Sequence, residues 1–181
     1  MKLIEQRYEK VEMLKSLVFD LKKFTTERDH LQDVIQDNYW LFGEQYNLVS
    51  ADQPFEDALS EYLYILDGNE GEKAKYKMTH TEKMRRPDIF LCRKRSLDDP
   101  RDEKSQMEEN VIVELKSPSV TIGTKEFRQV EDYLNIIVAD ERFNSSTRKW
   151  KFFLVGNKYT PDIALKHKAF NDRGKLHLVL E

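Results

Sequence analysis

The middle of the chain contains Arg86-Pro87-Asp88-Ile89-Phe90-Leu91-Cys92 and, after a polar insertion, Asn110-Val111-Ile112-Val113-Glu114-Leu115-Lys116. Each segment has the length of a short β-strand and is rich in Ile, Val, Leu or Phe. The insertion at Leu97–Lys104 is charged and interrupted by proline, which is typical of a solvent-exposed loop. The pattern therefore predicts two antiparallel strands joined by a polar loop.

Three charged residues lie within or beside these apolar segments: Asp88, Glu114 and Lys116. Side chains alternate along a strand, so Glu114 and Lys116 are expected on one face, and Asp88 shares a face with Phe90 and Cys92. Charged side chains are almost never buried unless they are paired or bind a metal. Two carboxylates that converge across a hairpin repel each other, and oxygen ligands favour Mg²⁺ or Mn²⁺ over zinc. Lys116 is then placed to stabilise charge that develops on a phosphate.

The same residues carry a resemblance to a known family. Pro87-Asp88, followed across the hairpin by Glu114-Leu115-Lys116, resembles the signature of the PD-(D/E)XK nuclease superfamily. The amphipathic helix that follows carries Gln129 and Tyr133 in the Gln-x-x-x-Tyr spacing of one nuclease subgroup. Three segments more specifically resemble the nuclease domain of Shedu-type anti-phage proteins, and the similarity covers most of the chain from about Asp37 to Tyr159. These segments are Asn38–Gly43, Arg85–Asp88 and Glu114–Pro118.

The resemblance implies an α/β fold with a restriction-endonuclease-like core, in which helices flank a mixed central β-sheet, with extra N-terminal helices. Residues 37–181 would form the nuclease-like domain, and residues 1–36 a helical segment that packs on the core or mediates oligomerisation. The implied activity is Mg²⁺- or Mn²⁺-dependent hydrolysis of phosphodiester bonds in nucleic acid, with DNA favoured over RNA, in anti-phage defence. The implied catalytic residues are Asp88, Glu114, Lys116, Gln129 and Tyr133, and the implied metal ligands are Asp88, Glu114, the Leu115 carbonyl and Glu44. For Glu44, an exposed helix-end glutamate is an equal alternative.

Composition sets limits on these expectations. The chain has 181 residues, enough for one domain with a proper core, and its formal net charge of −3 argues against a generic polyanion binder. Cation clusters must therefore be local, and each of them alone is typical of a solvated surface. Together they flank the expected site in sequence, which favours contact with phosphates. The clusters are Lys83/Arg85/Arg86, Arg93/Lys94/Arg95 and Arg148/Lys149/Lys151.

The cellular context can also be predicted. Cys92 is the only cysteine, so an intrachain disulfide is excluded and a reducing cytoplasm fits. No stretch reaches the roughly 18 apolar residues of a membrane span, which predicts that the chain does not cross a membrane.

Helical periodicity accounts for much of the remaining sequence. An apolar stripe from Ile4 to Phe24 predicts a long N-terminal helix that packs on the domain or forms a homo-oligomer. The remaining helices are predicted through Leu31–Ile35, capped by Thr26, from Pro54 to Leu66, from Lys125 to Ala139 and from Thr160-Pro161-Asp162 onward. Strands are predicted at Phe152–Gly156, where the apolar run indicates burial, and at Ala74–Met78 and Leu176–Leu180.

Two other classes of function stay open from the sequence. The chain could be a catalytically inactive nuclease-fold module that binds nucleic acid, or an oligomerising module of a larger protein. Two acids and a lysine on apolar strands favour the enzyme, whereas the acidic net charge favours an oligomerising module.

Overall fold

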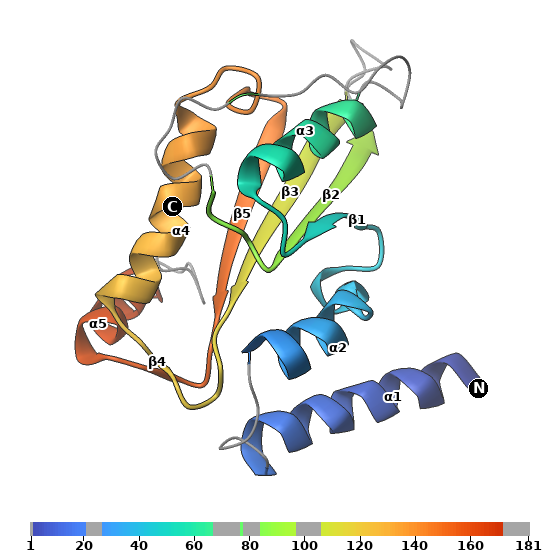
Figure 1. Cartoon of the computed structure of the whole chain (residues 1–181), viewed down its shortest axis with the longest axis vertical. Coiled ribbons are helices and arrows are strands. Elements are labelled where there is room, and N and C mark those ends of the chain that lie inside the picture. The colour runs from blue at the N-terminus through green and yellow to red at the C-terminus, as the bar shows by residue number, and fades with distance from the viewer. Residues whose placement is uncertain (1, 21–26, 67–76, 78–83, 97–105, 172–181) are drawn as a thin grey trace. The chain divides into compact units, whose positions relative to one another are not determined.

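The computed structural model describes residues 2–20, 27–66, 77, 84–96 and 106–171 (Figure 1). The chain divides into two compact units. One comprises Met1–Val34, Leu115–Glu131 and Leu154–Glu181, and the other comprises Ile35–Glu114 and Asp132–Phe153. None of the helices in the described ranges is long and apolar enough to cross a membrane.

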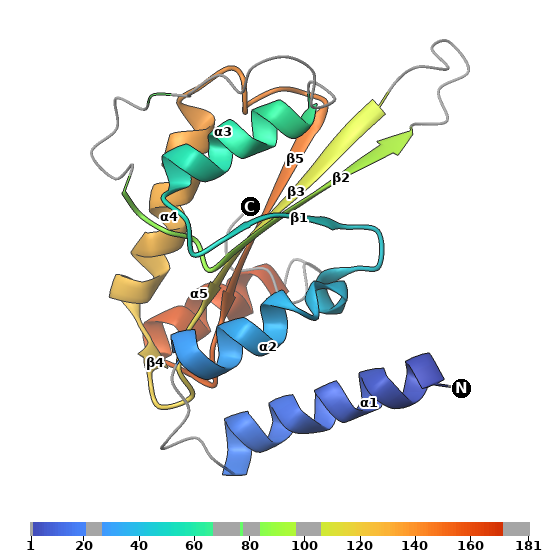
Figure 2. The ribbon, with the colours of Figure 1, turned by 45° about the vertical axis from the view of Figure 1, so that its right-hand side comes forward.

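A four-stranded sheet organises the second unit. Its strands are β1 (Asn47–Ala51), β2 (Ile89–Ser96), β3 (Gln106–Leu115) and β5 (Arg148–Val155), in the order β1-β2-β3-β5. The β1–β2 and β2–β3 pairs are antiparallel, and Figure 2 shows β2 and β3 side by side. Strands β3 and β5 are joined by backbone hydrogen bonds near both ends, from Glu108 N–H to the Thr147 carbonyl and from Lys116 N–H to the Val155 carbonyl. The residue number therefore rises in the same direction along both strands, so the pair is parallel. The predicted hairpin and the mixed sheet of an α/β fold are thus confirmed.

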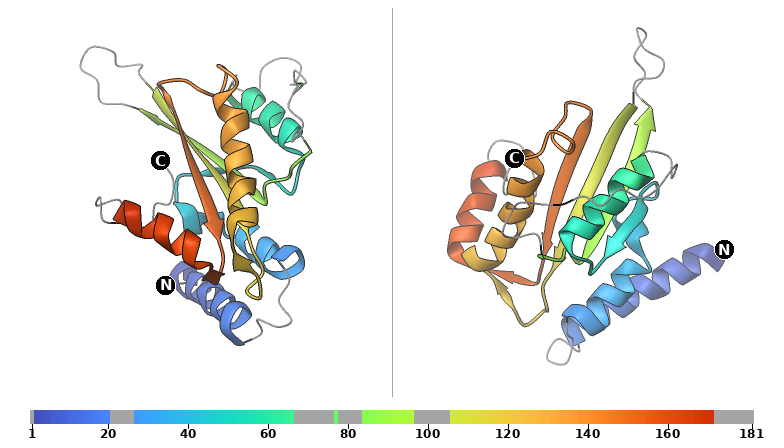
Figure 3. Two further views of the ribbon diagram at one scale, coloured as in Figure 1. Left: turned by 90° about the vertical axis from the view of Figure 1, so that its left-hand side faces the viewer. Right: turned by 45° about the horizontal axis from the view of Figure 1, so that its top comes forward.

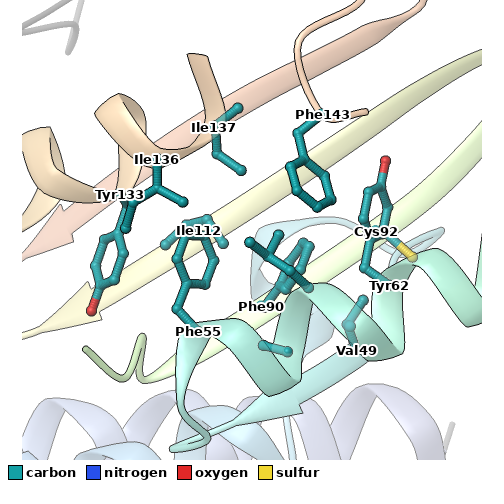
Figure 4. Packing of buried hydrophobic residues seen from close by; sticks show 12 residues of the cluster. Val49, Phe55, Tyr62, Phe90, Cys92, Ile112, Tyr133, Ile136, Ile137 and Phe143 are labelled. Carbon is teal, nitrogen blue, oxygen red and sulfur yellow. The ribbon is translucent and has the colours of Figure 1, made fainter. Parts of the chain in front are cut away.

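Two helices cover one face of this sheet. Helix α3 (Phe55–Leu66) and the second half of α4 (Thr124–Val138) contribute apolar side chains at steps of three and four residues. Figure 4 shows these side chains gathered over Phe90, Cys92 and Ile112 of the sheet. Aromatic rings meet at this core, with centroids 5.0 Å apart for Phe55 and Tyr133. The expectation that Phe90 and Cys92 share one face is confirmed.

The first unit has a smaller core. Strand β4 (Thr121–Ile122) pairs in parallel with β6 (Lys158–Tyr159), and helix α5 (Pro161–Asn171) follows β6. Ile122, Phe127 and Ile163 pack together, and the Thr124 hydroxyl donates to Asp162 Oδ2 at 2.9 Å. Figure 3 shows α5 beside the start of α4. Helix α5 begins at a proline, as Thr160-Pro161-Asp162 predicts.

The N-terminal segment is helical, and it exposes the first residues of its apolar stripe whereas Leu17 is buried. Helix α1 (Lys2–Lys15) continues into a π-helical stretch η1 (Ser16–Asp20), and η2 (Glu27–Gln32) leads into α2 (Asp33–Gln36). Within α1, all of which the structure describes, no residue is buried, and Ile4 and Tyr8 are 74% and 65% exposed. Whether this stripe packs or oligomerises stays a prediction.

The structure differs from the sequence expectations in several elements. Strand β1, the short strands β4 and β6 and the 3₁₀ helix η3 (Tyr39–Phe42) were not predicted. Strand β5 is not buried, because alternate residues along its whole length are exposed. The hairpin strands are also longer than predicted, with β2 reaching Ser96. The predicted loop at 97–104, the strand at 176–180 and the Thr26 cap lie outside the described residues. Of the predicted strand at 74–78 only Lys77 is described, and it does not belong to a strand.

Candidate active site

The hairpin register brings Asp88 and Glu114 opposite each other. The last paired residues at this end are Ile89 and Val113, and continuing the register by one residue makes Asp88 the partner of Glu114. Both side chains are buried, with 8% and 4% of their surface exposed. The backbone of Asp88 is fixed by β1, because the Asp52 N–H donates to the Asp88 carbonyl at 3.2 Å. Two acids therefore face each other at the end of the hairpin.

Helix α4 supplies a hydroxyl group to this pair. The Tyr133 hydroxyl donates to Glu114 Oε2 at 3.1 Å, and Figure 4 shows the hydroxyl at the edge of the aromatic cluster. Burial raises the pKa of Tyr133, and the charges of Glu114 and Asp88 raise it further, so the phenol stays protonated and acts as a donor. The sequence did not predict this contact of Tyr133 with Glu114, and the catalytic role of Tyr133 stays a prediction.

An ion pair beside this cluster was not recognised in the sequence. Arg85 Nη2 lies 2.6 Å from Asp132 Oδ2, and Asp132 immediately precedes Tyr133 on α4. The Arg85 carbonyl also accepts a hydrogen bond from Phe55 N–H at 2.7 Å. The Arg86 guanidinium donates to the Asp52 carbonyl at 3.0 Å. These two arginines, which were expected to contact phosphate, thus tie the entry to β2 to neighbouring elements. Only the position of Asp132, next to Tyr133, could have indicated this ion pair from sequence.

Lys116 and Gln129 belong to the first unit. Lys116 is buried just after β3, and its N–H donates to the Val155 carbonyl at 2.8 Å. Gly156 permits a close approach here, since a Cβ at this position would lie 2.7 Å from Ile122 Cδ1 and 3.5 Å from Lys116 Cβ. Gln129 is half-buried, one helical turn before Tyr133 on α4. The catalytic roles of Lys116 and Gln129 stay predictions.

A side-chain cap fixes the start of α4, which lies in the same unit as Lys116. Glu126 Oε2 accepts a hydrogen bond from Gly123 N–H at 2.9 Å, which is the backward arm of a capping box. This hydrogen bond is the main cause that lowers the pKa of Glu126, and the charges of Lys125 and Lys116 contribute less. The cap fixes the first turn of the helix that carries Gln129 and Tyr133.

The donor set limits which metal ion would fit. Among the residues that the structure describes, no three His, Cys, Asp or Glu side chains form a group that could hold a metal. Glu44 is exposed in the turn after η3, so it does not form such a group with Asp88 and Glu114. The two buried carboxylates nevertheless fit Mg²⁺, which proteins commonly bind through one or two carboxylates and several waters. The part expected of the Leu115 carbonyl stays a prediction.

Many of the remaining expected phosphate-binding cations gather around two acids at the other end of the hairpin. Glu109 Oε2 lies 2.5 Å from Arg93 Nη2 and 3.4 Å from Lys151 Nζ, and Glu109 Oε1 lies 3.8 Å from Arg95 Nη1. Glu108 Oε2 lies 2.5 Å from Arg148 Nε. Sequence reasoning missed both glutamates, although their positions beside the basic residues in the hairpin are the signal. Lys83 lies outside the described residues.

A pocket of about 300 Å³ lies at this same end, away from Asp88 and Glu114. Tyr62, Cys92, Glu108 and Asn110 contribute to its lining. Asn110 Nδ2 donates to the Tyr62 hydroxyl at 2.9 Å, and that hydroxyl donates to Glu108 Oε2 at 3.0 Å. Burial, aided by the Glu108 charge, raises the pKa of the Cys92 thiol to about 11, so the thiol is protonated near neutral pH. The pocket therefore holds no reactive thiolate, and apolar side chains share its lining with polar ones.

Comparisons of the chain with protein-family models, with curated proteins and with solved structures found no match.

Proposed function

We propose that this chain is a metal-dependent nuclease of the PD-(D/E)XK type, which hydrolyses phosphodiester bonds in nucleic acid, with DNA as the favoured substrate. The observation that supports this function is the pair of buried acids, Asp88 and Glu114, opposed across the hairpin with the Tyr133 hydroxyl on Glu114. Opposed buried carboxylates destabilise a fold unless a proton or a cation compensates their charge. Buried acids gathered in one place are therefore a reasonable mark of function.

Each residue has a distinct role in this proposal. Asp88 and Glu114, with the Leu115 carbonyl, would hold Mg²⁺ or Mn²⁺, and a bound ion of this kind lowers the pKa of water and neutralises phosphate charge. Tyr133 orients the Glu114 carboxylate through its hydrogen bond. Lys116, two residues along the chain from Glu114, supplies positive charge for the transition state, and Gln129 acts as a positioning residue. Glu44 is not included, because it is exposed and does not lie with Asp88 and Glu114 as a third acid among the described residues.

The biological setting is proposed on other grounds. The resemblance of the Pro87-Asp88 and Glu114-Leu115-Lys116 segments to Shedu-type nuclease domains supports anti-phage defence. The buried free thiol of Cys92 supports a reducing cytoplasm. The exposed apolar residues Ile4 and Tyr8 on α1 support homo-oligomerisation through that helix.

The test is cleavage of plasmid, single-stranded DNA and RNA with Mg²⁺, Mn²⁺ or EDTA. The wild type should cleave at least one substrate with metal and none in EDTA. Asp88→Asn and Glu114→Gln should abolish this cleavage. Asp57→Asn, which changes an exposed acid on α3 in the same way, should leave it intact. Cleavage that persists in Asp88→Asn, or that does not need metal, would refute the assignment.

A catalytically inactive nuclease-fold module is the second candidate. The observation that favours it is the lack of a three-residue metal group among the described residues. This candidate predicts that the wild type binds the same substrates without cutting them in any metal, so the same experiment separates the two.

A further inference from the structure

The sheet has a second face, opposite the one that carries Asp88, Phe90 and Glu114. Side chains alternate along strands, so Arg93 and Arg95 of β2 lie on this second face together with Glu109 of β3. The contact of Lys151 with Glu109 places the exposed residues of β5 on the same face. We call the set Arg93, Arg95, Lys149 and Lys151 the basic face.

In the described part of this face, the four cations outnumber the one acid that the set contacts. Glu109 is the acid that three of the four cations contact, and one carboxylate can offset only one of them. Arg93 is anchored, since its guanidinium binds Glu109 and lies 4.8 Å from the centre of the Tyr46 ring. The side chains of Arg95 and Lys151 are 63% and 50% exposed and lie farther from the carboxylate. Exposed ion pairs of this kind are worth little, so both side chains can turn to a phosphate at small cost.

An aromatic ring continues the row of cations along β5. The exposed positions of this strand are Lys149, Lys151, Phe153 and Val155, and alternate residues on a strand are about 6.8 Å apart. Phe153 is 41% exposed, and its ring contacts the tilted ring of Phe42, with centroids 5.7 Å apart. A partly exposed ring that a neighbouring ring holds in place can stack with a flat ligand. Surfaces that bind single strands combine cations that follow the backbone with aromatic rings that stack on bases.

We propose that the basic face, together with Phe153, binds single-stranded nucleic acid, with phosphates contacting Arg95 and Lys151 and a base stacking on Phe153. A single strand fits better than a duplex, because only an unpaired base can offer its flat surface to a protein ring. The face lies on the other side of the sheet from Asp88 and Glu114, so it is a contact additional to the proposed active site. It shares the substrate class of the proposed function but does not require cleavage.

Fluorescence anisotropy in EDTA tests this proposal, with a labelled strand of roughly 16 nucleotides and the duplex made from it. The wild type should bind the strand more tightly than the duplex. The double variant Arg95→Gln/Lys151→Gln should bind less tightly, with the slope of log affinity against log salt shallower by about 1.4, since each phosphate contact contributes about 0.7 for single strands. Lys2→Gln/Lys10→Gln removes the same charge from exposed positions of α1 and should keep the wild-type slope.

The stacking contact is tested separately. Phe153→Leu keeps an apolar contact with Phe42 but removes the ring, and should weaken binding of the strand by roughly 5- to 150-fold. Thermal melts show whether each variant is folded, and a double variant that does not fold is replaced by Lys151→Gln alone, which should make the slope shallower by about 0.7. Arg95→Lys and Phe153→Tyr keep the charge and the ring, and should bind like the wild type.

The outcomes separate this inference from the proposed function. Asp88→Asn should bind the strand as the wild type does while losing cleavage. Binding that is unchanged in Arg95→Gln/Lys151→Gln, or weakened equally in the α1 control, overturns the inference even if the wild type is an active nuclease. Equal affinity for strand and duplex, with no effect of Phe153→Leu, also overturns it. Specific binding without any cleavage supports the inference while the proposed function fails.

Discussion

Replacing Tyr133 with phenylalanine removes one hydroxyl group from the centre of the candidate site. That hydroxyl donates to Glu114 Oε2 at 3.1 Å, and both side chains are almost completely buried. A hydrogen bond to a charged group contributes about 1.5–3 kcal/mol to stability. Tyr133→Phe should therefore lower the free energy of unfolding by about this amount, which corresponds to roughly 3–12 °C in Tm for a chain of this size.

A double-mutant cycle shows whether the acceptor is the Glu114 carboxylate. With Glu114→Gln the acceptor is neutral, so Tyr133→Phe should then cost only about 0.5–1.5 kcal/mol. Urea denaturation, with a comparison of m-values, gives all four stabilities. Tyr8→Phe, at an exposed position of α1, should change stability by less than about 0.5 kcal/mol. If Tyr133→Phe costs the same in both backgrounds within about 0.5 kcal/mol, the hydroxyl does not bind the carboxylate and the site is wrongly built.

Four further predictions concern single residues. Without metal, Asp88→Asn should raise Tm because it removes the repulsion between Asp88 and Glu114. With Mg²⁺ at a hundred times its Kd, the stability of the wild type should rise by about 2.7 kcal/mol and that of the variant by far less. Equal shifts of Tm in thermal melts of the two proteins would contradict this. Lys116→Ala should lower the rate of metal-dependent cleavage at least ~100-fold in a gel assay without loss of folding, and a wild-type rate would reject its role. Phe127→Ala should lower the free energy of unfolding, measured by urea denaturation, by roughly 3–5 kcal/mol because Phe127 is a buried core residue. Gln129→Ala should instead lower the turnover rate at nearly constant Tm. The reverse pattern would mean that the buried face of the helix is wrongly assigned. The pKa of Cys92 is raised by burial from 9.0 to about 11, so the unfolded thiol loses its proton first and stability should fall as pH rises from 9.0 to about 11. Cys92→Ala should lack this part of the decline, measured as unfolding free energy against pH, and an identical decline would show that the thiol is not buried.

Local sequence signals were sufficient for the hairpin and the helices. The runs Ile89–Cys92 and Asn110–Leu115 have enough β-branched and aromatic residues to be strands, and the polar break between them suggests that they pair. Helices α3 and α4 follow from their apolar periodicity. The opposition of Asp88 and Glu114 follows once the hairpin register is known, since a register keeps every residue of a strand on a fixed face.

Other features depend on tertiary contacts that periodicity does not contain. Phe152–Val155 is a continuous apolar run, yet its alternate residues are exposed, because a run alone does not tell how many faces of a strand are covered. β1 has only five residues, too short a run to stand out in the sequence, and it forms because β2 offers a hydrogen-bonding edge. The acidic partners of Arg85, Arg93 and Arg148 are far away in sequence or across the sheet, so assigning each pair needs the strand register and the packing of α4. The exposure of Glu44 depends on the turn after η3 in the same way.

The central place of β2 and β3 in the sheet has a consequence for amide hydrogen exchange. Both strands have a neighbour on each side, and Ile89, Leu91, Ile112 and Val113 are almost fully buried. Amides in such strands exchange only when large parts of a protein open, whereas those of an exposed helix exchange by local fraying. The slowest-exchanging amides should therefore be those of Ile89–Cys92 and Val111–Val113, directly next to the two acids, and those of α1 among the fastest. The acid pair would then stay in place during the frequent partial openings that reach the edges of the sheet.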